Sequence, residues 1–93
     1  MILEIVSPEA TLFSGEVTSV TVPGINGEFQ MLNNHAAIVS ILQKGNIKIT
    51  AANFNIEKAN EAKFTKVNEQ NYWLAINSGT IEMNNNKIIV LAD

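Results

Sequence analysis

The sequence predicts an all-β protein, either a small sandwich or a barrel, on three observations. Short runs rich in β-branched and aromatic residues recur along the chain. Gly, Pro and Asn turns separate these runs at intervals of roughly ten residues. Few windows place apolar residues at the spacing of an amphipathic helix. At 93 residues the chain has room for one domain, residues 1–93.

The first half of the chain contains four predicted strands. The first ends at Ser7-Pro8, because proline cannot donate a hydrogen bond to a ladder. The third ends at Pro23-Gly24, which is a strong turn signal. In the fourth, Phe29 and Met31 fall on one face of the strand. These predicted strands are residues 2–6, 11–13, 16–22 and 27–32.

The second half contains further strands and one ambiguous segment. Apolar and polar residues alternate in 47–50, and "YWLAI" (72–76) is a continuous apolar run consistent with a strand buried on both faces. The segments 80–83 and 87–92 form a closing hairpin around the Asn turn 84–86, since Asn tolerates the left-handed conformation. Residues 57–66 fit either one exposed helical turn or the tip of a long hairpin.

Composition and charge exclude several partners. All six cationic side chains are Lys and the net charge is −3, which weighs against nucleic-acid binding. The absence of Cys removes disulfides and thiolate metal sites and favours a reducing compartment. No apolar run approaches the roughly 18 residues of a membrane-spanning helix, so we expect no direct insertion into lipid.

The sequence lacks the residue sets that catalysis requires. His35 is the only imidazole and Asp93 the only Asp, and no motif places either beside a nucleophile. One His among dispersed Glu residues is too few ligands for a metal. No pattern brings two carboxylates together, and "PGINGE" lacks the spacing of a phosphate loop. We therefore expect no catalytic residue, cofactor or metal, and no enzyme activity of the chain on its own.

Three segments, taken in order, carry a family resemblance over nearly the whole chain. They are "EIVSPEATLFSGEVTSVTVPGINGEF", "GEFQMLNNHAAIVSILQKGNIKI" and "NSGTIEMNNNKIIVLAD". They resemble the N-terminal β-sandwich domain of the epsilon subunit of F-type ATP synthase, which implies a sandwich of about ten short strands. The resemblance implies a non-catalytic rotor subunit that joins the gamma subunit to the c-ring and couples proton or sodium flow to ATP synthesis. It also implies a monomer when isolated, located peripherally at the cytoplasmic face of the bacterial inner membrane.

The same resemblance implies two sets of contact residues. His35 falls in the family's gamma-facing segment, with a core histidine satisfied by a backbone carbonyl as the alternative. Glu28 falls in the loop that points to the c-ring, with an ordinary solvated turn carboxylate as the alternative. The gamma set is Ser7, Asn33, Asn34, His35, Ala36, Ile38 and Leu42, and the c-ring set is Ile25, Asn26, Gly27 and Glu28.

The chain departs from the family pattern at four places. Residues 33–37 replace Pro-Gly-His-Ala-Pro without either proline or the glycine, although Asn can still adopt a positive φ. Residues 77–79 (NSG) replace Ser-Gly-Gly, which puts the close backbone packing at the middle position in question. Residues 51–71 are longer than the usual loop. The sequence stops at Asp93, where most relatives continue into an inhibitory helical hairpin, so we expect a naturally short form, with a truncated chain as the alternative.

One rival interpretation is a stand-alone β-sandwich module that binds a carbohydrate or a peptide. Such modules present exposed aromatic rings, and Phe54, Phe64 and Tyr72 lie in or beside the unassigned segment 51–71. The other aromatic residues occur in apolar strand contexts that predict core positions.

Overall fold

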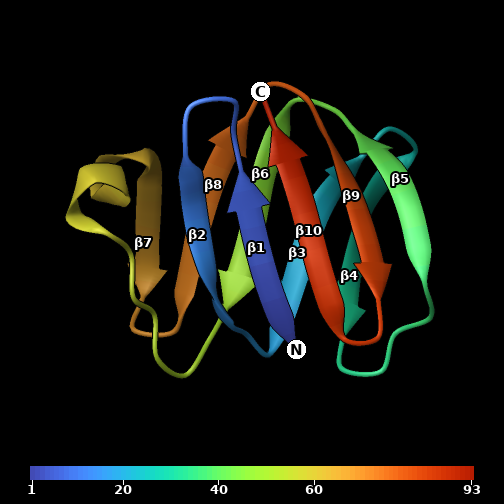
Figure 1. Ribbon diagram of the computed structural model, residues 1–93, viewed down its shortest axis with the longest axis horizontal. Helices are drawn as coiled ribbons and strands as arrows, with labels where there is room; N and C mark the ends of the chain where they lie inside the picture. The colour runs from blue at the N-terminus through green and yellow to red at the C-terminus, as the bar shows by residue number, and fades with distance from the viewer.

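The computed structural model describes all 93 residues and shows ten strands in two packed layers (Figure 1). One layer has the strand order β2-β1-β10-β9-β5, and the other has the order β7-β8-β6-β3-β4. The layers are joined where β3 and β5 pair at Gly24 and Leu42, so the strands form one sheet that folds over on itself. The predicted all-β sandwich is confirmed. The strands are β1 (Ile2–Val6), β2 (Thr11–Glu16), β3 (Ser19–Gly24), β4 (Gly27–Leu32), β5 (Ile38–Leu42), β6 (Gly45–Thr50), β7 (Phe64–Asn68), β8 (Asn71–Ile76), β9 (Gly79–Asn84) and β10 (Lys87–Ala92).

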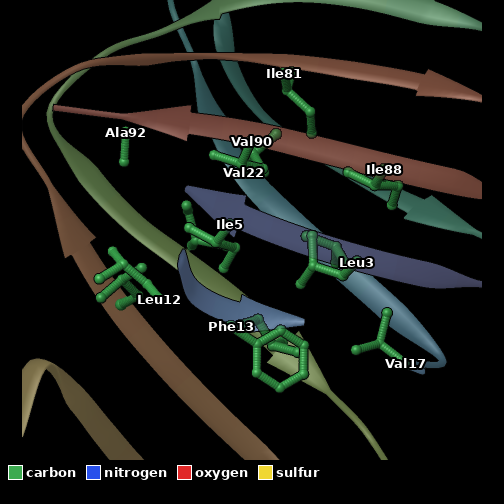
Figure 2. Close-up of a cluster of buried hydrophobic side chains, with 14 of the residues drawn as sticks. Leu3, Ile5, Leu12, Phe13, Val17, Val22, Ile81, Ile88, Val90 and Ala92 are labelled. Carbon is green, nitrogen blue, oxygen red and sulfur yellow. The ribbon is translucent and has the colours of Figure 1, made fainter. Parts of the chain in front are cut away.

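The core lies between the two layers and contains 20 buried apolar residues. Alternate residues of each strand supply it, as the two-residue period of a strand requires: Leu3 and Ile5 from β1, and Ile88 and Val90 from β10. Figure 2 shows these side chains directed into the same interior as Val22 from the opposite layer. With no disulfide in the chain, burial of this apolar surface is the main source of stability.

The first and last strands of the chain are parallel neighbours. β1 pairs with β10 from Ile2 opposite Lys87 to Val6 opposite Leu91, whereas every other strand pair is antiparallel. β2 and β9 flank this pair, so both strands lie inside the layer (Figure 1). The two ends of the sequence therefore hold the centre of one layer together.

The predicted strand at residues 16–22 is wrong in its extent. The chain ends β2 before Val17, turns at Val17 and Thr18, and then begins β3 in the other layer. Other strands satisfy this turn, since the Val17 amide donates to the Met1 carbonyl (2.9 Å) and the Thr18 amide to the Thr50 carbonyl (2.8 Å). The β-branched residues of 16–22 indicate extended backbone, but their composition does not show where the chain crosses from one layer to the other.

The interpretation of residues 72–76 as a strand buried on both faces is also wrong. In β8, Leu74 and Ile76 face the core, but Trp73 is only half-buried on the outer face. The ammonium of Lys48 lies 4.7 Å from the Trp73 ring centroid, at the distance of a cation–π contact. An apolar run can therefore have one face in the core and the other under a long charged side chain.

Of the two alternatives for residues 57–66, the helical turn is the one that the structure shows. Residues Lys58–Lys63 form η1, a single 3-10 helix, and the chain then continues directly into β7. β7 pairs antiparallel with β8, but the tip of this hairpin is at Glu69 and Gln70, so the alternative of a hairpin tip at residues 57–66 is wrong. The segment before β7 lies at the side of the sandwich where β2 and β7 are the edge strands (Figure 1).

Aromatic stacking fastens this segment to both layers. The Phe54 ring stacks on Phe13 of β2 and on Tyr72 of β8, with centroid distances of 4.7 and 3.9 Å. Phe64 meets Phe54 edge-on at 5.9 Å. The buried Asn60 adds a hydrogen bond from its Nδ2 to a carbonyl at the start of β2. The extra length of residues 51–71 thus closes the open side of the sandwich.

Two turns use the positive backbone angles that Asn tolerates. Asn85 and Asn86, with φ of 50° and 59°, form the two-residue link between β9 and β10, so the predicted turn at 84–86 is confirmed. Asn34 has φ of 65° in the link between β4 and β5. The expectation that Asn can replace the family's Gly in this turn is confirmed at Asn34.

At the end of β10, the Asp93 carboxylate accepts hydrogen bonds from the amides of Asn77 and Ser78, each at 3.2 Å. The Ser78 amide is the largest cause that lowers the pKa of Asp93 below its ordinary value. Desolvation opposes the lowering of this pKa, and the Asn77 amide adds to it. The carboxylate therefore ties the β8–β9 turn to the end of β10 when it is ionised.

Asp93→Asn is expected to destabilise the protein at neutral pH but not in strong acid. A carboxylate with a lowered folded-state pKa stabilises the fold above its unfolded pKa, about 3.9 for Asp, and this stability is lost as pH falls through the folded-state pKa. Urea unfolding from about pH 6 to about pH 2 should show the two proteins converging in stability. Glu9→Gln, which removes an exposed carboxylate from the β1–β2 turn, controls for net charge. A gap between Asp93→Asn and the wild type that stays constant over this range contradicts the assignment.

Candidate functional site

β5 presents its apolar side chains to the outside and its polar side chain to the inside. Ser40 stands opposite the buried Ile81 of β9, so it occupies the core side of the strand. Val39 and Ile41 point outward and are 76% and 60% exposed. A sandwich strand normally has the opposite pattern, with its polar residues in water. β5 is therefore a candidate contact strand.

The exposed apolar side chains of β5 continue across the neighbouring strands. The register places Ile41, Thr80 and Leu91 side by side on β5, β9 and β10, and directly opposite residues share one face of a sheet. Leu91 is 54% exposed. The β5–β9–β10 face, as this surface is called below, contains the apolar residues Val39, Ile41, Ile89 and Leu91 together with Thr80 and Glu82. Exposed apolar side chains gathered on one face in this way are typical of a binding surface.

The charge of this face is negative. Glu82 lies between Val39 and Ile89, and Glu4 follows Ile89 on β1 in the same row. Lys87 stands one row farther along, towards the β9–β10 turn. The surface that complements this face has an apolar centre and basic groups beside it.

The loop Asn33–Ala37 leads into β5 and is exposed along its whole length. The His35 amide donates to the Leu32 carbonyl at 3.2 Å, which closes a turn with Asn34 at its positive-φ position. The Nδ1 atom of His35 lies 2.7 Å from the Ala36 carbonyl. The alternative of a core histidine is wrong, because His35 is exposed on the loop.

The other residues of the predicted gamma set do not all join this loop. Leu42 is 2% exposed and lies in the core, so its place in the predicted gamma set is wrong. Ile38 is half-buried and faces inward with Ser40. Ser7 belongs to the β1–β2 turn, at the opposite end of the sandwich from the β4–β5 loop (Figure 1), where its hydroxyl bonds Ala10. The structure brings together Asn33, Asn34, His35 and Ala36, which precede the exposed face of β5.

The predicted c-ring set forms the tip of the β3–β4 hairpin. Ile25 and Asn26 are exposed at the tip, and Gly27 has φ of 119°, which favours glycine. The Ile25 amide donates to the Ile41 carbonyl at 3.3 Å, so the tip is fixed beside the end of β5. The loop Asn33–Ala37 lies at the other end of β5 (Figure 1). A single strand thus connects the two predicted contact regions.

Glu28 forms an ion pair on the outer surface of the layer that contains β3, β4 and β6. Its Oε2 lies 3.1 Å from the ammonium of Lys48, which in turn covers Trp73. The Glu28 side chain is 51% exposed, and exposed pairs of this kind contribute only about 0–1 kcal/mol to stability. Glu28 is therefore oriented by Lys48 while its carboxylate still faces water.

The aromatic residues that suggested a carbohydrate or peptide site are engaged with one another. Phe54 is sandwiched between Phe13 and Tyr72, and Phe64 is buried against it. Their rings contribute to the closure of the sandwich edge instead of forming an open stacking platform. No three His, Asp or Glu side chains lie close enough together to hold a metal ion. The only helical segment, η1, is much too short to cross a membrane.

The predicted gamma set did not include Val39, Ile41 and Leu91. The run "AIVSIL" contains apolar residues at both parities, so its composition does not show which side faces water. One signal was available: Leu42 lies an even number of residues from Ser40, so a buried Leu42 requires Ser40 to face inward as well. Val39 and Ile41 then face outward.

The fold and the candidate site define the class of protein. It is a small β-sandwich domain with a docking surface, and this surface consists of the outer face of one strand and the loops at its two ends. Within that class, the chain belongs to the ATP synthase delta/epsilon chain family. The sequence profile described as "ATP synthase, Delta/Epsilon chain, beta-sandwich domain" matches residues 1–93.

Curated relatives support the same family. The chain is 40% identical to an ATP synthase epsilon chain of Campylobacter jejuni over 89 residues, which is 96% of this chain and 57% of that protein. It is 37% identical to that of Campylobacter curvus over 91 residues, 98% of this chain and 59% of that protein. For Helicobacter pylori the identity is 34%, over 98% of this chain and 61% of that protein. The chain thus spans about three-fifths of the length of these relatives.

Solved structures share the fold. One chain in the Tetrahymena thermophila mitochondrial ATP synthase, described as central stalk/c-ring, has a TM-score of 0.71 at 13% identity and matches 99% of this chain and 62% of its own length. One in the Euglena gracilis mitochondrial ATP synthase, described as OSCP/F1/c-ring, has a TM-score of 0.73 at 16% identity, over 99% of this chain and 49% of its own length. At these identities the likeness establishes the fold.

Proposed function

We propose that this chain is the β-sandwich part of a non-catalytic epsilon subunit in a proton- or sodium-translocating F-type ATP synthase. It acts in the central stalk, where it joins the gamma subunit to the c-ring and supports the coupling of ion flow to ATP synthesis. In this role it is a peripheral subunit at the cytoplasmic face of the bacterial inner membrane, and it is a monomer when isolated. The family match and the docking surface support this proposal.

The observation that carries the proposal is the reversed polarity of β5. Val39 and Ile41 are exposed although the fold offers an inward face for apolar side chains, and Leu91 extends the same surface. When a partner covers these three side chains, their apolar surface is removed from water, which favours binding. The gamma subunit is the proposed occupant, and its matching surface contains basic groups opposite Glu4 and Glu82.

The second contact is proposed at the tip of the β3–β4 hairpin, against the c-ring. The tip is bonded to the end of β5, and the gamma-facing loop precedes the start of the same strand. Of 56 backbone hydrogen bonds, 46 lie within strands and helices, so the body between the two contacts is a cross-linked sheet. A close-packed body of this kind transmits force between its ends with little deformation.

Calorimetric titration of the chain into its cognate gamma subunit tests the proposal. We expect a one-to-one complex with a negative heat-capacity change, because apolar surface is buried. A second titration, into detergent-solubilised c-ring with and without gamma, tests the other contact. If the chain binds neither gamma alone nor the c-ring with gamma present, the proposed function is contradicted.

Glu28→Lys is expected to weaken the contact with the c-ring about tenfold and to leave the domain folded. The new ammonium faces Lys48, which now repels it, and the negative charge at the base of the hairpin tip is lost. Stability should change by at most about 1 kcal/mol, because the pair is exposed. Glu69→Lys is the matched control, since it breaks the other exposed ion pair, with Lys66, by the same change of charge. Unfolding of the Glu28→Lys protein makes Glu28 a structural residue instead.

A further inference from the structure

The gamma-facing loop is held by the turn between β9 and β10. The backbone amide of Asn34 donates to Oδ1 of Asn86 at 2.6 Å, and Nδ2 of Asn86 donates to Oδ1 of Asn34 at 3.0 Å. The carbonyl of Asn86 also accepts a hydrogen bond from the Ile2 amide at 2.9 Å. Asn86 therefore links the loop to the turn and to the first strand. The pair Asn34–Asn86 is called the asparagine clasp below.

The clasp needs Asn at both positions and not simply a residue that tolerates positive φ. Asn34 and Asn86 have φ of 65° and 59°, a region where glycine is the default residue. Glycine at position 34 keeps the amide that donates to Asn86 but removes the Oδ1 acceptor. Glycine at position 86 removes both hydrogen bonds. The two side chains thus contribute contacts that the backbone conformation does not require.

The loop has little else to fix it in place. All five residues from Asn33 to Ala37 are exposed, so no buried side chain anchors them. None of them is proline, so no φ is fixed covalently. Their other hydrogen bonds are local, from His35 to Leu32 and within His35–Ala36. Apart from its bond to the end of β4, the loop is connected to the sheet by the hydrogen bonds of the clasp.

We propose that Asn86 is a positioning residue for the gamma contact, acting through the asparagine clasp. It holds Asn34 and His35 in one conformation beside the exposed end of β5, so that less conformational entropy is lost when the surface docks. This inference rests on the proposed gamma contact. It assigns a role in that contact to a residue on a different hairpin from the loop itself.

Asn86→Gly tests the proposal, with Asn85→Gly as the matched control. Both substitutions keep a positive φ in the same turn and loosen the unfolded chain equally, but only Asn86→Gly breaks the clasp. Relative to Asn85→Gly, we expect the Asn34 amide to exchange hydrogen about tenfold faster and affinity for gamma to fall about tenfold. The loss of affinity should appear as a less favourable binding entropy. Asn34→Gly, which keeps one of the two bonds, should give an intermediate result.

Hydrogen exchange of the Asn34 amide and affinity for gamma distinguish failure of the clasp from failure of the proposed function. If the wild type does not bind gamma, the proposed function fails, while hydrogen exchange still reports whether the clasp orders the loop. If Asn86→Gly matches Asn85→Gly in both exchange and affinity, the clasp orders nothing and the inference is overturned. Faster exchange of the Asn34 amide with unchanged affinity also overturns it, because the clasp is then structural only.

Discussion

Ile41→Asp is expected to lower affinity for the gamma subunit by about a hundredfold or more, while the domain stays folded. Ile41 is 60% exposed between Val39 and the hairpin tip, in the middle of the proposed contact. In the complex the new carboxylate loses its water and lies in the same face as Glu82 and Thr80. In the free chain it stays in water, so the stability cost is about 0.5–1 kcal/mol, set mainly by strand propensity.

Val67→Asp is the matched control for this substitution. Val67 is 50% exposed on β7, an edge strand of the other layer and outside both proposed contacts. It should bind gamma as the wild type does in the same calorimetric titration. Comparable losses in the two variants indicate a general effect of charge, and full affinity of Ile41→Asp removes the β5–β9–β10 face from the gamma contact.

Gly79→Ala is expected to reduce the free energy of unfolding by about 3 kcal/mol, near the upper end of overpacking effects. A Cβ at this position lies 2.5 Å from the Leu91 carbonyl oxygen, and a backbone atom cannot rotate away from it. Gly79 pairs with Ala92 on one side and Leu42 on the other, so relief of the clash displaces β10 or β5. For a domain of this size, the loss corresponds to roughly 12–24 °C in Tm.

Gly15→Ala provides the comparison. Gly15 also lies within a strand, but its added Cβ meets only the far end of the Phe13 ring, at 3.1 Å. A ring edge can shift by a few tenths of an ångström, so this variant should lose less than about 1 kcal/mol. Urea unfolding of both proteins measures the difference. Equal stabilities show that β9 and β10 separate more easily than their packing indicates.

The period of apolar residues predicted the interior of the fold wherever one face was clearly apolar. Phe29 and Met31 share the inner side of β4 as expected, and Ile47 and Ile49 are both buried in β6. Prediction failed at 72–76, where both faces are apolar in composition but only one is in the core. A tryptophan under a lysine side chain has the same sequence signature as a core tryptophan. Long-range neighbours decide such cases, and a linear sequence does not show them.

Only the loops of the candidate site could be predicted from the sequence. Turn chemistry and the family resemblance located Asn33–Ala36 and the hairpin tip, because local residue types set these features. The surface role of Val39 and Ile41 depends on which side of β5 meets β9, and the clasp depends on Asn86, far along the chain. Strand register and hairpin-to-loop contacts arise from the packing of the whole sheet. They became visible only in three dimensions.

The sandwich cannot close until β10 has been made, because β10 is the parallel partner of β1. Of the ten strands of the sandwich, β1 is made before the other nine and its parallel partner β10 after them, so Ile2 cannot pair until Lys87 has been made. Until then the nascent chain exposes an unpaired side of β1 next to apolar residues destined for the core, a state prone to aberrant strand pairing. Contacts this distant in sequence also slow folding, since the loop must close before any bond forms. Ribosomal stalling before Lys87 therefore releases an open layer and not a smaller sandwich.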